Sequence, residues 1–162
     1  MFYRFPRSAV AGVLSVCALF TSACTPQYIN TDELGAPVGS EAEIFRLFSG
    51  NSFPNGSGGA FYGKDGSYRG LSPEGDSIVI GTWRTHRSLG TSRLCEEATT
   101  HYKNDGKTVS TGPHHRCYVV YLQPDGAVAL DQMGGTNYDM GKPVRGFAME
   151  RRFKSARNRL KV

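Results

Sequence analysis

Short runs of β-branched and aromatic residues, separated by glycine-rich turns, dominate the chain. The strongest runs are residues 77–85 (SIVIGTWRT) and 116–122 (RCYVVYL). Asp-Gly dipeptides at Asp65, Asp105 and Asp125 are typical of β-hairpin turns. An antiparallel sheet of about six to eight strands has to close or fold on itself to hide its edges. The pattern therefore predicts an all-β fold, a small antiparallel β-barrel or sandwich.

The run at residues 77–85 carries apolar residues at both odd and even positions. Because side chains alternate between the two faces of a strand, this run predicts a central strand that is covered on both sides. Gly81 interrupts it and indicates a bend or bulge. We expect the following residues in the core: Ile78, Ile80, Trp83, Val119 and Tyr121.

A helical pattern is present near each end of the domain. Ser40 and Glu43 form a capping-box motif, and Ile44, Leu47 and Phe48 follow at helical spacing. This predicts a short N-terminal helix of about two turns that packs on the sheet.

The C-terminal segment predicts a basic amphipathic helix. Met149, Phe153, Ala156 and Leu160 form one helical stripe. The segment 142–162 has 8 basic residues and 1 acidic residue, whereas residues 24–141 have 9 basic and 13 acidic ones. The helix either binds an anionic surface (lipid, lipopolysaccharide phosphate or another acidic partner) or packs its stripe on the domain and exposes solvated cations. The cations for anionic-surface binding are Arg151, Arg152, Lys154, Arg157, Arg159 and Lys161.

The first residues have the order of an export signal. Arg4 and Arg7 precede an uncharged, mostly apolar run of 13 residues at positions 8–20. A membrane-spanning helix needs about 20 apolar residues, so the run has the length of a signal-peptide core instead. Small residues follow at positions 21–23 and predict cleavage after Ala23.

Ser22, Ala23 and Cys24 resemble the lipobox of bacterial lipoproteins, although Thr21 stands where that family usually has Leu. The resemblance implies cleavage after Ala23, lipidation of Cys24 (palmitate among its acyl chains), and an anchor in the outer membrane facing the periplasm. Cleavage at the same bond without lipidation leaves a periplasmic or secreted protein as the alternative. Export makes nucleic acid a poor partner.

The four cysteines fit the same prediction. Cys17 leaves with the signal and Cys24 carries lipid, which leaves Cys95 and Cys117 as one pair in a compartment that permits disulfides. Two reduced, buried cysteines are the alternative. The expected organisation is a signal peptide at 1–23, a tether at 24–39, a β domain at 40–141 and a basic C-terminal segment at 142–162.

No catalytic, cofactor or metal set stands out in the sequence. His114 and His115 follow Gly112-Pro113 and are expected in a loop; a surface metal site with His101 is the alternative to solvated histidines. Glu96 and Glu97 are neighbours on an expected strand, so they face opposite ways and make a poor acid–base pair. The sequence therefore favours a non-enzymatic protein with no metal and no cofactor.

An ordered set of short motifs extends over most of the expected domain. These are Gly50-Asn51-Ser52-Phe53, Tyr62-x-x-Asp65-Gly66, Gly81-Thr82-Trp83, Leu94-Cys95 and Cys117-Tyr118-Val119-Val120. They resemble a family of small exported alphaproteobacterial proteins of unknown function, over roughly residues 41–134. The resemblance implies a lipocalin-like β domain and brings no established activity.

Three functions are compatible with the sequence. The first is a non-enzymatic envelope module that binds an anionic lipid surface or an envelope protein. The second is a periplasmic protease inhibitor, because a small lipid-anchored β-barrel with one disulfide and a buried Trp resembles the bacterial metalloprotease inhibitors. The third is a carrier of a small apolar ligand, because aromatic residues such as Phe53, Phe61, Tyr62, Tyr68 and Trp83 could line a barrel.

Overall fold

The computed structural model describes residues 35–132 and 136–162. The export signal expected at 1–23, Cys24 and the tether up to residue 34 lie outside the described residues. Ala36–Pro37, in the last part of the expected tether, forms strand β1 and pairs antiparallel with the end of β7, where Ala36 lies opposite Leu122.

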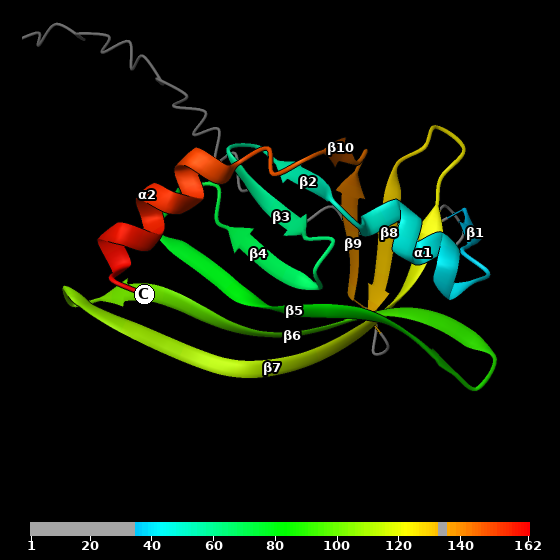
Figure 1. The fold of residues 1–162 in the computed structure, drawn as a ribbon, viewed down its shortest axis with the longest axis horizontal. Helices are drawn as coiled ribbons and strands as arrows, with labels where there is room; N and C mark the ends of the chain where they lie inside the picture. Colours follow the sequence, from blue (N-terminus) through cyan, green and yellow to red (C-terminus); the bar gives the residue numbers. More distant parts are fainter. Residues whose placement is uncertain (1–34, 133–135) are drawn as a thin grey trace, which may run out of the picture.

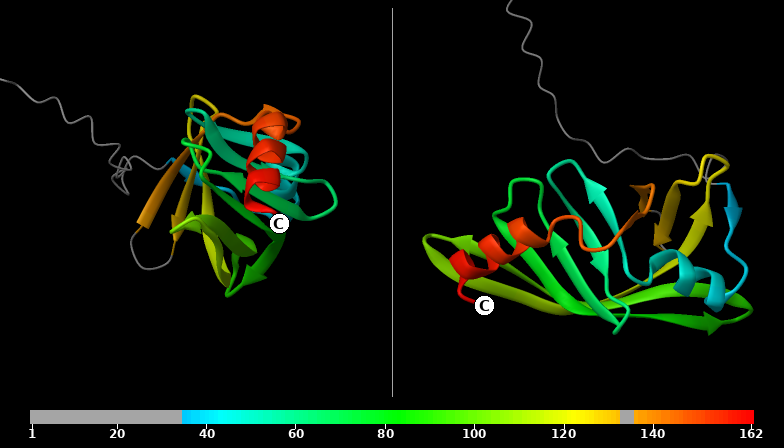
Figure 2. Two further views of the ribbon diagram at one scale, coloured as in Figure 1. Left: turned by 90° about the vertical axis from the view of Figure 1, so that its left-hand side faces the viewer. Right: turned by 45° about the horizontal axis from the view of Figure 1, so that its top comes forward.

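Ten strands of the described residues form one antiparallel sheet that curls into a half-barrel (Figure 1). Along the sheet the order is β10-β2-β3-β4-β5-β6-β7-β8-β9, with β1 added beside β7. The fold is thus one curled sheet rather than two packed sheets (Figure 2). Besides β1, the strands are β2 (Asn51–Asn55), β3 (Gly58–Tyr62), β4 (Ser67–Leu71), β5 (Ser77–Ser88), β6 (Thr91–Asn104), β7 (Lys107–Leu122), β8 (Val128–Gln132), β9 (Thr136–Gly141) and β10 (Val144–Arg145).

The three long strands β5, β6 and β7 form the centre of this sheet. They contain 12, 14 and 16 residues, and hairpin turns join them in sequence order. The backbones of β5 and β6 leave no room for a side chain at Gly81, because a Cβ atom there would clash with the Glu97 carbonyl oxygen. Its partner Ala98 adjoins the irregularity that shifts the register between β6 and β7. Only glycine can therefore stand at this point of β5 without separating β5 from β6.

The inner face of the curl holds the larger core. Buried side chains come from β2, β3 and β5 to β8, and α1 (Glu41–Phe48) adds Ile44 and Phe48, both fully buried. Ser40 begins α1 with a reciprocal cap: its hydroxyl accepts the Glu43 N–H, and the Glu43 carboxylate accepts the Ser40 N–H. These contacts fix α1 across one end of the curl. The inner core comprises Ile44, Phe48, Phe53, Ala60, Tyr62, Trp83, Leu94, Tyr118, Val120, Val128 and Leu130.

A second core lies on the outer face of β3, β4 and β5. Helix α2 (Glu150–Leu160) covers this face with the apolar stripe that the sequence predicted. Phe153 packs near Phe147, whose ring stacks on Phe61 of β3 with centroids 4.6 Å apart. The outer core comprises Leu71, Ile78, Met149, Phe153, Ala156 and Leu160. The stripe of the basic helix is therefore part of the fold and is not free to insert elsewhere.

Two expectations about β7 are wrong. Val119 and Tyr121 are only half-buried and face outward, whereas Tyr118 and Val120 fill the inner core. His114 and His115 lie in the strand itself, opposite Ala98 and Glu97, and not in a loop. Both errors have one cause: the 16-residue strand continues through Pro113, and its facing is set by pairing with β6.

Among the helices of the described residues, none combines the length and the apolar character that crossing a bilayer requires.

Candidate functional site

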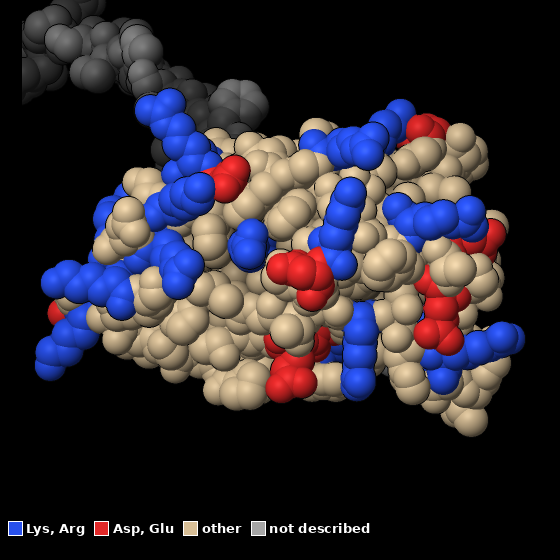
Figure 3. Space-filling view, in the orientation of Figure 1, with Lys and Arg blue, Asp and Glu red and all other residues tan. Residues whose placement is uncertain are grey.

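The basic surface is the first candidate site, and α2 builds it. The stripe residues, which are Met149 at the N-cap and three residues within α2, are buried against the sheet, so the cations between them point to solvent. All six cations expected to bind an anionic surface are exposed, and basic side chains gather over this end of the molecule in Figure 3. We call these six residues and their neighbours Lys103 and Lys107 the basic end.

Hydrogen bonds fix the basic end to the sheet. Arg152 donates to the Pro73 carbonyl at 3.0 Å, and Arg159 donates to the Gly75 carbonyl. At the other side, Thr108 of β7 donates to the Leu160 carbonyl at 2.7 Å. Lys103 donates to the same Thr108 hydroxyl at 3.0 Å, which brings the β6–β7 turn beside the C-terminus of α2. The cations are thus held on a rigid face, and the sequence alone did not show that Lys103 belongs to it.

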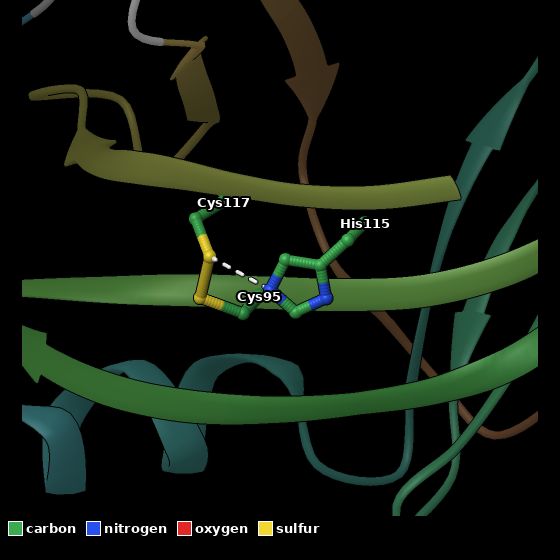
Figure 4. A group of neighbouring side chains, drawn as sticks. All are labelled: Cys95, His115 and Cys117. Carbon is green, nitrogen blue, oxygen red and sulfur yellow. Dashed lines mark hydrogen bonds between the residues drawn. A yellow bond between two sulfur atoms is a disulfide. The ribbon is translucent and has the colours of Figure 1, made fainter. Parts of the chain in front are cut away.

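The disulfide on the outer face is the second candidate. Cys95 on β6 and Cys117 on β7 are direct cross-strand partners, joined by an S–S bond of 2.05 Å. The predicted pair is confirmed. Figure 4 shows His115 beside it, with its Nε2 atom 3.8 Å from the Cys117 sulfur. The His115 Nδ1 atom lies 4.0 Å from a Glu97 carboxylate oxygen.

The donor atoms of Cys95, Cys117 and His115 lie within 4.8 Å of one another, as in a metal site. The two sulfurs are bonded to each other, however, and a metal binds the thiolate form of cysteine. The cluster is therefore a covalent cross-link with a neighbouring imidazole. His101, which belonged to the alternative of a surface metal site, contacts Ser110 at 2.8 Å, further along the strands. His114 faces the opposite side of β7 from His115 and lines the inner face.

The third candidate is a cleft on the inner face, left open between the core and the rim of the sheet. It encloses about 360 Å³, with a smaller recess of about 80 Å³ beside it. Glu96 of β6 and Arg116 of β7 line both spaces and are direct cross-strand partners. Four tyrosines surround them: Tyr62, Tyr68, Tyr118 and Tyr138.

Glu96 is the most unusual side chain of this cleft. Only 8% of its surface is exposed, and its Oε1 atom accepts a hydrogen bond of 2.6 Å from the Tyr62 hydroxyl. Arg116 stands opposite but is not among the ion pairs found in the described residues. Instead it interacts with the Tyr118 hydroxyl. A buried carboxylate without a paired cation is energetically costly.

The electrostatics of the cleft follow from this burial. Burial raises the pKa of Glu96 to about 7, although the Tyr62 hydrogen bond and the charge of Arg116 act in the opposite direction. Burial and the nearby Glu96 charge raise the pKa of Tyr62 and Tyr68 well above the usual range. The tyrosines are thus neutral hydrogen-bond donors, and Glu96 changes its charge near neutral pH.

The sequence placed Glu96 and Glu97 on opposite faces of a strand, and the structure confirms this: Glu97 lies beside His115 outside, and Glu96 faces inward. What the sequence missed is the environment of Glu96. Trp83 lies beside it on β5, and Tyr62 reaches it from a strand 34 residues earlier. Its position one residue after Cys95, on the face of the buried Leu94 and Ala98, was the one available signal.

Comparison with known protein families, with curated proteins and with solved structures gave no match. The resemblance to the exported alphaproteobacterial family therefore stays a prediction.

Replacing both Cys95 and Cys117 by Ala should lower the free energy of unfolding by roughly 3 kcal/mol, because the cross-link closes a loop of 22 residues. Urea unfolding of the variant and of the oxidised protein measures the difference. His115→Ala, which leaves the bond intact, is the control. Equal stability of the double variant and the oxidised protein would show that the bond is energetically neutral.

Glu96→Gln should remove a pH dependence of stability. The folded-state pKa of Glu96, about 7, lies above the ordinary value of 4.5, so the native protein binds the proton more tightly than the unfolded chain does. Wild-type stability should therefore fall by roughly 3 kcal/mol relative to the variant as pH rises from 4.5 to above 7. Urea unfolding at pH 5 and pH 8 tests this, with the exposed Glu97→Gln as control. Parallel pH profiles for wild type and Glu96→Gln would contradict it.

Proposed function

We propose that this chain is an exported, lipid-anchored protein of the bacterial cell envelope that acts by binding and not by catalysis. Its basic end holds the domain against an anionic, phosphate-bearing membrane surface. The observation that carries the proposal is the division of α2 into a stripe buried on the sheet and six exposed cations. The stripe packs on the domain, which is the second of the two arrangements that the sequence left open, and the cations face solvent, where they can contact an anionic surface without insertion of the helix.

The electrostatic attraction between the basic end and an anionic bilayer is of the size expected for a contact that assists a lipid anchor. Each Lys or Arg near an anionic bilayer contributes about 1 kcal/mol at most, and salt screens this attraction within about 10 Å. Two or more acyl chains on Cys24 would supply stable anchoring, which one chain does not. The anchor also keeps the basic end at a high effective concentration near the membrane. A weak, reversible contact is then sufficient to orient the domain.

Binding in place of catalysis agrees with the chemistry of the described residues. The cysteines that approach His115 are joined as a disulfide and are not nucleophiles. Glu96 has a tyrosine as its hydrogen-bond partner, and its sequence neighbour Glu97 faces the opposite side of the sheet. A buried carboxylate that is held by a tyrosine, as Glu96 is, is suited to recognising a ligand.

Lipidation can be tested by the intact mass of the protein isolated from its native membranes. We expect the mass of residues 24–162 plus a diacylglycerol and an acyl chain, since the Ser22-Ala23-Cys24 motif resembles a lipobox. Treatment with a reductant should add two hydrogens, because one disulfide is present. An unlipidated mass that begins at Cys24 would remove the anchor from the proposal and leave a periplasmic or secreted protein.

Surface binding can be tested separately with a Cys24→Ser variant, which cannot carry lipid. It should sediment with vesicles of phosphatidylglycerol and phosphatidylcholine, should not sediment with phosphatidylcholine alone, and should be released by high salt. Neutralising Arg151, Lys154, Arg157 and Lys161 to Gln should lower vesicle binding at least tenfold.

A matched variant provides the control for this experiment. Arg46, Arg84, Arg87 and Arg145 are also exposed and lie outside α2, so their replacement by Gln removes the same net charge. Equal loss of binding in both quadruple variants would mean that net charge and not the basic end is responsible. A parallel measurement with lipopolysaccharide aggregates distinguishes its phosphates from those of phospholipid.

A further inference from the structure

The inner cleft holds two opposite charges at different depths. Glu96 is nearly buried at the floor, whereas Arg116, directly opposite on β7, is exposed at the mouth. Cross-strand neighbours of opposite charge usually pair. Here the Arg116 side chain interacts with the Tyr118 hydroxyl, and Glu96 accepts its hydrogen bond from Tyr62. The floor of the cleft is thus acidic and its mouth is basic.

Aromatic rings form the walls on both sides of this charge pair. Tyr62 and Tyr68, from β3 and β4, have ring centroids 5.1 Å apart. Tyr118 and Tyr138, from β7 and β9, face each other edge to face at 5.9 Å. Aromatic faces attract ammonium groups, and the attraction grows when the cation is desolvated. A cation that reached Glu96 would therefore find aromatic rings as well as a carboxylate.

The polarity of the cleft excludes two simpler classes of ligand. A purely apolar ligand would remove water from Glu96 without giving it a partner, which costs free energy. A ligand with only a positive charge would be repelled by the Arg116 guanidinium at the mouth. A molecule with an ammonium group at one end and a carboxylate at the other complements both residues. The volume of about 360 Å³ lies at the small end of the usual range for ligand pockets, about 300–1,000 Å³.

We propose that the inner cleft binds a small zwitterion, of the size of an amino acid or a dipeptide, with its ammonium group on Glu96 and its carboxylate on Arg116. The ligand enters with its amine first, because the acidic group is deep and the basic group is at the mouth. This site lies on the inner face of the sheet, whereas α2 lies on the outer face. Ligand binding and surface binding therefore depend on separate residues.

Three probes that share one apolar body test the proposal. They are L-phenylalanine (zwitterion), 2-phenylethylamine (cation) and 3-phenylpropionate (anion). The fluorescence of Trp83, the only tryptophan, serves as the readout, because it lies beside Glu96 in the sheet and its ring centroid is 5.7 Å from that of Tyr62. We expect the zwitterion to bind at least tenfold more tightly than either singly charged probe.

Variants of the two charged residues assign the ends of the ligand. Glu96→Gln should reduce the affinity for phenylalanine to that for phenylpropionate, and Arg116→Gln should reduce it to that for phenylethylamine. Glu97→Gln and Arg84→Gln are the matched controls, because each removes one charge of the same sign from an exposed residue outside the proposed site. Both variants should bind phenylalanine as the wild type does.

Several results would overturn the proposal. They are equal binding of the three probes, no binding of any probe at millimolar concentration, and equal losses in Glu96→Gln and Glu97→Gln. The comparison of the three probes uses the wild-type protein, so it stands even where a variant fails to fold. Because no step involves the basic end, failure here is distinguishable from failure of vesicle binding.

Discussion

One sheet with apolar side chains on both faces governs the architecture. β5 places Ile78 on one face and Trp83 on the other, so each face needs its own cover. The sheet covers its inner face by curling on itself, with α1 placed across one end. It covers the outer face of β3 to β5 with α2. The curl leaves an inner cleft, and the outer cover brings the cations of α2 to the surface. Both candidate binding surfaces are consequences of this single demand for burial.

The strands that flank the Asp-Gly turns could be predicted from the sequence because hairpin turns and runs of β-branched residues are local signals. Which side chains of a strand point to the core could not be predicted where both the odd and the even positions are apolar. In the run from Tyr118 to Tyr121 all four residues are apolar or aromatic, and the pairing of β7 with β6 fixes which of them point inward. The disulfide could be predicted because the expected export signal and the expected lipidation of Cys24 leave Cys95 and Cys117 as one pair.

The candidate sites show the same division between local and long-range information. The stripe and cations of α2 follow from helical spacing within one segment. Lys103 joins them only because Thr108 bonds to the end of the helix. The sequence predicted only that Glu96 and Glu97 face opposite sides of a strand. The burial of Glu96 depends on Trp83, its partner on β5, and on Tyr62, which donates a hydrogen bond to it. The alternation of Glu96 with Leu94 and Ala98 gives its face but does not identify these two partners.

The two proposed membrane contacts lie at opposite ends of the half-barrel. Strand β1, through which the chain enters the domain, lies beside the end of β7, and α2 lies at the opposite end of the long axis (Figure 1). An anchor that acts through β1 and a charged contact that acts through α2 would hold the molecule at two separated points. The long axis of the domain would then lie parallel to the membrane plane, and the domain could not rotate freely about a single tether.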